Sequence, residues 1–456
     1  MKKYLSTFLA LALIVSLFAG CGSETASETV SESAPASAES TAEETPEATP
    51  EETLLARMNE IISDPEHPLM AAAVGVIKDG QIVFADAVGS KQDGGDPATE
   101  DTKYRIASIS KLVTSIGVWQ LIEQGLIDPE ADASEYLGFE LKNPNYPDTP
   151  ITVKMIMSHT SSIREGTYNI PYGHNISEFF TEGTDCYYEG CWAPAEEAPG
   201  EFFSYCNMNY CLMGTVIENV SGQRFDLYMK EHVFEPMGLT CSYNVSDMPE
   251  DVQAQVGTLY RKFNEAGEYD PTNGVWTAQC DDFTEGYPNE DYSDYEIGSN
   301  GSLFGPMGSL RVSVKELCQI MQMFCSDGAY NGAQILKPET IDQMFTPVWT
   351  YDPEKENGDT YYGLMNCYGM GPHIFTNTDM GDRMVVGQDL PFVGHTAEAY
   401  GLLGGLGFDR EKDNGLVYIV AGTGSDMDEY YGAYSAFYGW EEALLTAGAE
   451  YAQFGY

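Results

Sequence analysis

The sequence predicts an α+β fold with two lobes. Two apolar runs, residues 71–77 and 81–87, are joined by Lys78-Asp79-Gly80, and Asp-Gly is a strong signal for a β-hairpin. A long stretch with helical periodicity follows, and two further apolar runs, residues 402–408 and 416–421, lie near the end of the chain. Strands at both ends around a helical middle predict an antiparallel sheet flanked by helices, with a second, mostly helical lobe.

The first 53 residues are predicted to lie outside the folded domain. Residues 1–20 have the basic start and short apolar core of a secretory signal, too short to span a bilayer. They end in Leu-Phe-Ala-Gly before Cys21, which resembles a bacterial lipobox, in which the cysteine is lipidated. An ordinary signal peptide followed by a chance cysteine is the alternative. Residues 21–53 are rich in Ser, Thr, Glu and Pro and contain no aromatic residue, so we expect a disordered tether.

These features indicate where the protein works and what it does not bind. With a lipid at Cys21, the folded domain, residues 54–456, is expected outside the cytoplasm, anchored to the bacterial cell membrane. The formal net charge of the chain is −49. Nucleic acid is therefore excluded as a partner, because its phosphates would be repelled. We expect a monomer.

Residues 105–125 predict a helix that is buried on all sides and ended by Gly125. Its first turn carries Ser108 and Lys111. Residues three apart on a helix are neighbours, so the lysine lies within reach of the serine hydroxyl, where free backbone N–H groups favour negative charge. A serine nucleophile needs such surroundings. The Ser-x-x-Lys pattern alone is weak evidence, since about two copies are expected by chance in a chain of this length.

The helical middle offers further candidate residues. Residues 151–163 predict a short helix capped by Thr152, and its His159 is either a catalytic base or a group that satisfies the backbone where the helix ends. Tyr205 and Asn207 precede a helix and are expected on a loop, where catalytic groups tend to lie. Other helices are predicted over residues 54–62, 313–324 (with a Ser313/Glu316 capping box), from Pro338 onward and 430–447.

The cysteines and histidines do not form a metal-binding pattern. The chain has ten cysteines; with Cys21 assigned to the lipid, an odd number remains, so at least one is free or pairs between chains. Cys186 and Cys191 are candidates for a disulfide in an oxidising compartment. The six histidines are scattered, and neither C-x-x-C nor H-E-x-x-H occurs. We therefore expect no metal and no cofactor.

Three motifs occur in a characteristic order. They resemble the motifs of the penicillin-recognising serine hydrolases, most closely the beta-lactamase-related branch with class C beta-lactamases, D-alanyl-D-alanine carboxypeptidases and related esterases. The resemblance covers about residues 54–447 and implies a beta-lactamase/transpeptidase-like fold with the active site between the two lobes. The motifs are Ser108-Ile109-Ser110-Lys111, Tyr205-Cys206-Asn207 and His395-Thr396-Ala397.

The resemblance implies an acyl-enzyme mechanism. Ser108 would be the acylated nucleophile. Lys111 would hold Tyr205 partly as phenolate, and the pair would take the serine proton and return it to the leaving group, with either residue as the formal base. The backbone N–H groups of Ser108 and Glu398 would form the oxyanion hole.

The resemblance also assigns the walls of the cleft. Asn207 would hydrogen-bond the substrate's amide, and His395 and Thr396 would line the opposite wall. Two residues depart from the family's motifs. Ala397 stands where the family usually has glycine, and its methyl group is expected either to narrow the cleft or to push the substrate's backbone away; Cys206 replaces the Ser or Ala that is common between the tyrosine and the asparagine. In addition, His395 in place of lysine points away from an efficient beta-lactamase.

These residues predict a serine hydrolase acting on a small peptide, beta-lactam or ester, with carboxypeptidase-like or esterase-like activity. The alternative is a non-catalytic surface protein that binds cell-wall peptides with the same fold. That alternative predicts that Ser108→Ala leaves ligand affinity unchanged. A solute-binding lipoprotein of a transporter is a third hypothesis, but it gives no reason for three ordered motifs.

Overall fold

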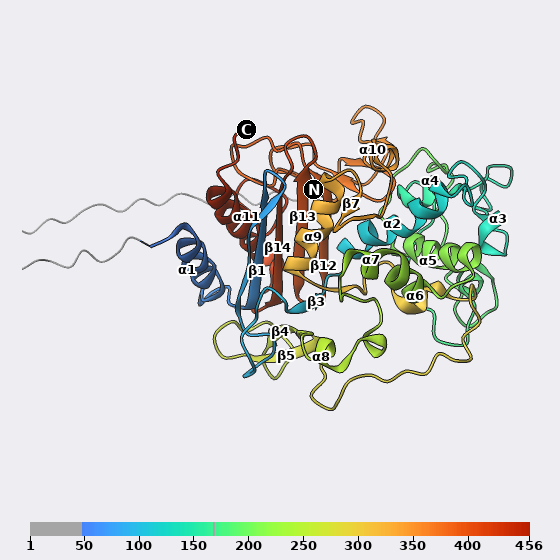
Figure 1. Ribbon diagram of the computed structural model, residues 1–456. Coiled ribbons are helices and arrows are strands. Elements are labelled where there is room, and N and C mark those ends of the chain that lie inside the picture. The colour runs from blue at the N-terminus through green and yellow to red at the C-terminus, as the bar shows by residue number, and fades with distance from the viewer. Residues whose placement is uncertain (1–47, 167–168) are drawn as a thin grey trace, which may run out of the picture. The chain divides into compact units, whose positions relative to one another are not determined.

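The computed structural model describes residues 48–166 and 169–456. A central sheet, almost entirely antiparallel, joins strands from both ends of this region (Figure 1). A parallel bridge from the central strand to a side hairpin is the exception. In spatial order the strands of the main path are β2 (Gln81–Gly89), β1 (Leu69–Lys78), β14 (Asn414–Thr423), β13 (Leu402–Asp409), β12 (Val393–Ala399), β11 (His373–Ile374), β10 (Cys367–Tyr368) and β9 (Trp349–Thr350), and the side hairpin is β4 (Leu259–Phe263) and β5 (Val275–Cys280).

The strands β1, β13 and β14 are buried on both faces because helices cover each face of the sheet. Successive side chains of β1 alternate: Ala72, Val74 and Val76 pack beneath α1 (Pro50–Ile62) and α11 (Gly439–Ala452), and their neighbours face α9 (Val314–Cys325) and α2 (Ile109–Glu123). Both predicted hairpins are confirmed, β1 with β2 and β13 with β14.

The second lobe is mostly helical, and α2 connects it to the sheet (Figure 1). Twelve of the fifteen residues of α2 are buried, as its apolar sequence predicts. It packs on β12 from one side and on α5 from the other, which confirms the predicted fold class. The other helices are α3 (Ser134–Leu137), α4 (Val153–Met157), α5 (Asn207–Ser221), α6 (Phe225–Met229), α7 (Glu235–Met237), α8 (Glu250–Gln253) and α10 (Pro338–Met344), and the remaining strands are β3 (Lys103–Arg105), β6 (Arg311–Ser313), β7 (Ala329–Tyr330) and β8 (Ala333–Gln334).

Several predicted boundaries are corrected by local hydrogen bonds. The first helix begins at Pro50 rather than 54, since Thr49 and Glu52 form a capping box, so the predicted tether ends before this helix. The final helix begins at Gly439 rather than 430, because the Glu441 carboxylate accepts the Tyr438 N–H and fixes the first turn there. The helix predicted over 151–163 is confined to α4.

The predicted signal, Cys21 and nearly all of the tether lie outside the described residues. Within the described part of the chain, no helix is both long and apolar enough to cross a bilayer. All nine cysteines there are free thiols, including Cys186 and Cys191, so the predicted disulfide is not formed.

Candidate active site

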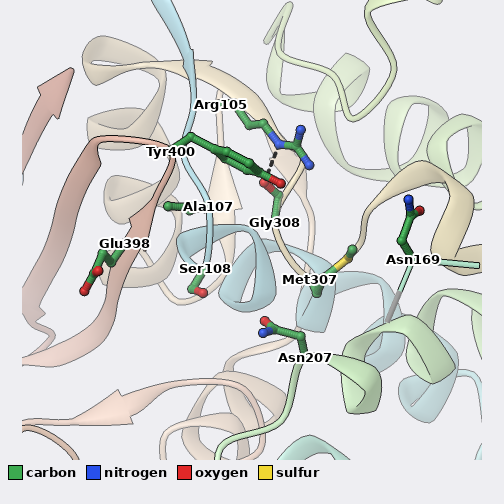
Figure 2. Close-up of a pocket in the computed structure, with 10 residues that line it drawn as sticks. Arg105, Ala107, Ser108, Asn169, Asn207, Met307, Gly308, Glu398 and Tyr400 are labelled. Carbon is green, nitrogen blue, oxygen red and sulfur yellow. Dashed lines mark hydrogen bonds between the residues drawn. The ribbon is translucent and has the colours of Figure 1, made fainter. Parts of the chain in front are cut away.

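Ser108 lies at the start of α2, directly behind an uncommon backbone conformation. Ala107 has a φ of 44°, in the left-handed region that non-glycine residues rarely adopt. Ser108 itself is the residue that precedes the first helical turn. Its N–H is therefore not used by the helix. Figure 2 shows Ser108 at this turn, with Asn207 and Glu398 on either side of it.

Lys111 is fully buried and directs its amine at the serine. Its Nζ lies 3.0 Å from Ser108 Oγ, 2.7 Å from Asn207 Oδ1 and 2.8 Å from the Met307 carbonyl oxygen. Burial lowers the pKa of Lys111 to about 7. When the amine is neutral, the two carbonyl oxygens accept its two N–H groups, and the lone pair points at Ser108 Oγ.

The ring of Tyr205 lies against this amine. Lys111 Nζ is 4.9 Å from the centroid of the tyrosine ring, a cation–π distance. Burial raises the pKa of Tyr205 well above its ordinary value, and the nearby Ser108 hydroxyl only partly opposes this. Burial thus favours the phenol form of Tyr205, and the partial phenolate that the resemblance implies stays a prediction.

His159 supports Tyr205 from behind. The two rings stack with centroids 4.3 Å apart. His159 Nδ1 accepts the Cys206 N–H at 3.1 Å, so it satisfies the backbone. Burial lowers the pKa of His159 well below its ordinary value, and Lys111 adds to this effect. Of the two roles considered for His159, a catalytic base or a group that satisfies the backbone, these contacts favour the second.

Glu165 is a member of the site that the motifs did not reveal. Its carboxylate accepts the Asn207 side-chain N–H at 2.7 Å and the backbone N–H groups of Asn207 and Met208, at the start of α5. An anion is favoured at a helix N-terminus. Glu165 lies in a loop 42 residues before Asn207, and no spacing pattern connects them.

The amide of Asn207 has one possible orientation. Lys111 can only donate and a carboxylate can only accept, so Oδ1 faces the lysine and Nδ2 faces Glu165. Both ends of the amide are therefore held within the protein. The contact between Asn207 and the substrate's amide stays a prediction.

β12 forms the opposite wall, but His395 lies behind it. His395 is fully buried. Its Nδ1 donates to the Thr396 carbonyl oxygen at 2.6 Å, so Nε2 accepts from the Tyr368 hydroxyl at 2.8 Å. Burial lowers its pKa to about 3. Both ring nitrogens of His395 are therefore used in internal hydrogen bonds, and His395 does not line either cavity beside Ser108, so its contact with a substrate stays a prediction. Thr396, Ala397 and Glu398 do line the wall.

Two cavities meet at Ser108. One, of about 470 Å³, extends towards Arg105, Met307 and Tyr400 (Figure 2). The other, of about 460 Å³, extends along β12 towards the start of α11. Asn207 and Glu398 also line both. The geometry thus places the serine at the centre of a cleft with room for a group on each side of a scissile bond.

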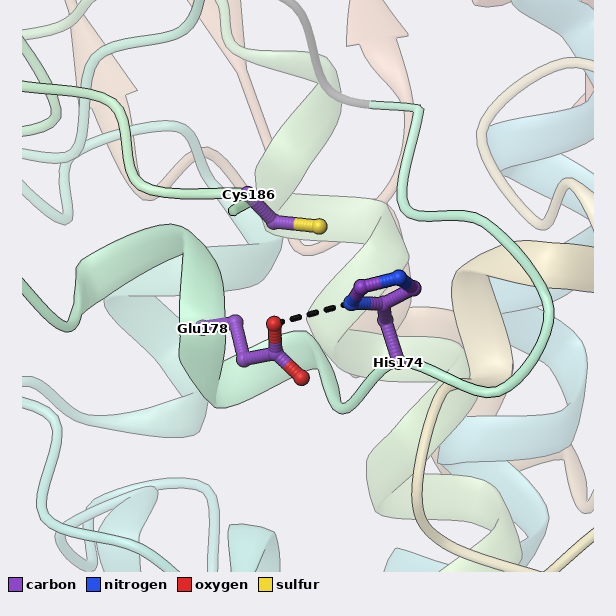
Figure 3. A group of neighbouring side chains, drawn as sticks. All are labelled: His174, Glu178 and Cys186. Atoms are coloured by element: carbon purple, nitrogen blue, oxygen red, sulfur yellow. Dashed lines mark hydrogen bonds and ion pairs between the residues drawn. The ribbon is translucent and has the colours of Figure 1, made fainter. Parts of the chain in front are cut away.

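One further cluster has the chemistry of a metal site, although the spacing of the histidines predicted none. His174, Glu178 and Cys186 bring one ligand atom each to within 4.8 Å of one another (Figure 3). His174 Nδ1 and Glu178 Oε2 are already paired at 2.9 Å, and Glu178 also accepts the Asn175 N–H. None of these residues lines either cavity beside Ser108, so the cluster is separate from the serine site.

Comparison with known proteins identifies the family. The model of the beta-lactamase family matches residues 60–438. The chain belongs to the beta-lactamase family. This is a family of serine hydrolases related to penicillin-binding proteins, as the three motifs predicted.

Individual relatives are distant. Protein flp of Staphylococcus aureus is 27% identical over 170 residues, which is 37% of this chain and 34% of that protein. The match thus spans about a third of this curated relative. A beta-lactamase/D-alanine carboxypeptidase from Yersinia pestis, solved with citrate, has a TM-score of 0.58 at 16% identity and is covered to 97%, against 88% of this chain. D-amino acid amidase from Ochrobactrum anthropi, solved with D-phenylalanine, has a TM-score of 0.60 at 16% identity, covering 88% of this chain and 99% of that one. These structures share the fold.

Proposed function

We propose that this beta-lactamase family member forms an acyl-enzyme at Ser108 with an amide or ester substrate, with carboxypeptidase-like or esterase-like activity. The observation that carries the proposal is the set of three contacts at Lys111 Nζ. The contacts with Asn207 Oδ1 and the Met307 carbonyl oxygen orient the amine. The third contact is with Ser108 Oγ, whose proton the amine must accept. A base with a pKa of about 7 suits this transfer at neutral pH.

In the proposed reaction Lys111 moves one proton during acylation of Ser108 and one during deacylation. Ser108 Oγ attacks the substrate carbonyl carbon as its proton moves to Lys111, and the negative charge on the carbonyl oxygen is met by the N–H groups of Ser108 and Glu398. Lys111 then returns the proton to the leaving nitrogen or oxygen as the bond to it breaks. Water then attacks the carbonyl carbon of the Ser108 ester while Lys111 accepts a proton from it. Lys111 passes this proton to Ser108 Oγ as the ester bond breaks, which releases the acid and restores the free serine.

The test is the intact mass of residues 48–456 after exposure to a fluorescent penicillin and, separately, to a fluorophosphonate. We expect an adduct with either probe in the wild type, retained in the surface control Ser293→Ala and lost in Ser108→Ala. A long-lived penicillin adduct would indicate an enzyme that is acylated but deacylates slowly, and a short-lived adduct would indicate an enzyme that hydrolyses penicillin with turnover. A folded protein with no adduct, whose affinity for cell-wall peptides is unchanged by Ser108→Ala, would support the non-catalytic binding protein instead.

We also propose that Cys21 carries a lipid that anchors the domain outside the cytoplasm, as a monomer on its tether. The basic start, apolar core and terminal cysteine of residues 1–21 support this. Expression of the full chain with a radiolabelled fatty acid should label the wild type and not Cys21→Ala. Equal labelling of both proteins would argue against the anchor, and size-exclusion chromatography of the soluble domain tests the oligomeric state.

A further inference from the structure

The cavity along β12 has an unusual combination of walls. Aromatic rings and carboxylates surround it, and the described residues that line it include no lysine, arginine or histidine. The carboxylates are Glu398 on β12, Asp428 in the 3-10 helix Met427–Glu429 between β14 and α11, and Glu441 at the start of α11. The rings are Tyr205, Tyr361, Tyr362, Tyr431, Phe437 and Tyr438.

The rings are arranged so that several faces and edges border the cavity. Tyr431 and Tyr438 stack with centroids 5.7 Å apart, and the Tyr431 hydroxyl donates to Asp428 at 2.9 Å. Tyr361 donates its hydroxyl to the Tyr205 carbonyl oxygen at 3.2 Å and packs edge-on against the Tyr205 ring. Ring faces carry negative potential, so such walls attract a cation.

Burial disfavours the ionised forms of Glu398 and Glu441. Burial raises the pKa of Glu398, and Asp428 raises it further, while Arg261 and the Tyr438 hydroxyl only partly oppose this. Burial likewise raises the pKa of Glu441 to about 7, although its contacts with Tyr418 and Tyr438 oppose the shift. A positive charge placed among these groups would lower the free energy of their ionised forms.

The other side of the cleft does not offer the same surroundings. There Arg105 donates to the Gly308 carbonyl oxygen and to Ser309 Oγ, and its guanidinium lies 5.1 Å from the centroid of the Tyr400 ring. The cleft is therefore asymmetric: Glu398 borders both cavities, Arg105 lines only the one towards Tyr400, and Asp428 and Glu441 line only the one along β12. The net charge of −49 adds a long-range attraction for cations.

We propose that the cavity along β12 is a subsite for an ammonium group, so that the substrates hydrolysed at Ser108 carry a free amine attached to an apolar or aromatic body. This rests on the proposed hydrolase function for its catalytic consequence, but binding to the subsite does not. Glu398 and Asp428 contact the amine, and the tyrosine rings cover the body. A terminal carboxylate on that side of the scissile bond is disfavoured, because it would face carboxylates.

Binding is tested on Ser108→Ala, which needs no turnover. Isothermal titration with 2-phenylethylamine, 2-phenylethanol and phenylacetate compares a cation, a neutral isostere and an anion. We expect the amine to bind about tenfold more tightly than the alcohol and phenylacetate to bind most weakly. Asp428→Asn in the same background should remove most of the difference, and Glu429→Gln, an adjacent acidic residue outside the cavity, should not. Equal binding of amine and alcohol, or tighter binding of phenylacetate, overturns the subsite.

Catalysis is tested separately with nitrophenyl esters of D-phenylalanine bearing either a free or an acetylated amine. We expect kcat/KM to favour the free amine, with the preference lost in Asp428→Asn and retained in Glu429→Gln. Hydrolysis without any preference contradicts the subsite while leaving the hydrolase intact. A preference in binding without hydrolysis of any ester contradicts the hydrolase while leaving the subsite intact.

Discussion

The carboxylate of Glu165 holds Asn207 by its amide nitrogen, at 2.7 Å, and thereby turns the amide oxygen towards Lys111. The two residues come from different segments of the helical lobe. Glu165 hydrogen-bonds Asn207, and Asn207 hydrogen-bonds Lys111, the proposed base. Glu165 is therefore a positioning residue, because it reaches the serine only through Asn207 and Lys111.

Glu165→Gln should slow acylation about tenfold, since a neutral amide no longer fixes the orientation of Asn207. The loss of a nearby negative charge should also lower the pKa of Lys111, because Glu165 raises it in the wild type. The rate of fluorophosphonate labelling against pH measures both effects. Glu201→Gln, on the exposed turn before Tyr205, is the matched control. An unchanged pH midpoint in Glu165→Gln would mean that its role is only structural.

The acylation rate of the wild type should rise with pH through about 7. Lys111 is protonated below its lowered pKa of about 7 and cannot accept the serine proton, whereas the neutral amine above it can. Lys111→Met should reduce acylation by about 10² to 10⁴-fold and abolish this pH step. Stopped-flow measurements with a chromogenic penicillin or ester supply the profile. A step that persists in Lys111→Met would assign the titration to another group.

Ala397→Gly should widen the cleft. The side chain of Ala397 lies on β12 and lines the cavity beside Ser108. Removal of its methyl group should raise the second-order acylation rate with a bulky penicillin by about tenfold, with little change for a small ester. Ala436→Gly, at another residue that lines the same cavity, is the comparison. Equal gains with both probes would indicate a general loosening of β12.

Glu316→Ala should be strongly destabilising. Glu316 is buried and pairs with Lys103 at 2.5 Å, and it also accepts the Ser313 and Thr240 backbone N–H groups. Loss of the carboxylate leaves Lys103 buried without its partner, at a cost of about 3–5 kcal/mol in the free energy of unfolding. Urea denaturation measures it, with exposed Glu339→Ala expected to change stability by less than about 0.5 kcal/mol.

The same pair makes stability depend on pH. Burial raises the pKa of Glu316, but the Lys103 ammonium and the hydrogen bonds outweigh it, so the net pKa in the folded state is lowered. The stabilisation is therefore present above the ordinary glutamate pKa of 4.5 and is lost as pH falls through the lowered value. Wild-type stability should decline more between pH 5 and 3 than that of Glu316→Gln. Parallel declines would assign the acid sensitivity to other carboxylates.

Local patterns predicted the elements that carry the motifs. The apolar periodicity of residues 105–125 identified α2 as a helix buried on all sides, and Asp79-Gly80 identified the first hairpin. The capping box of Ser313 and Glu316 marked the start of α9. Each of these signals depends on residues that are close together in the sequence, so it can be recognised in a single sequence.

The contacts of the site could not be predicted in this way. Glu165 is 42 residues from Asn207, and the placement of His395 behind the wall depends on Tyr368, 27 residues away. Nothing in the spacing of these residues indicates which side chains meet, because each contact depends on how whole elements pack.

The sequence by itself determined the α+β class, the buried helix with Ser108 and Lys111 one turn apart, and the order of the three motifs. Only the tertiary structure decided that Lys111 is oriented by Asn207 and Met307, that His395 is neutral and internal, and that carboxylates and aromatic rings converge beside the serine. The physical reason is that pKa values and cavity walls depend on burial and on neighbours from distant segments, whereas periodicity depends only on local backbone geometry.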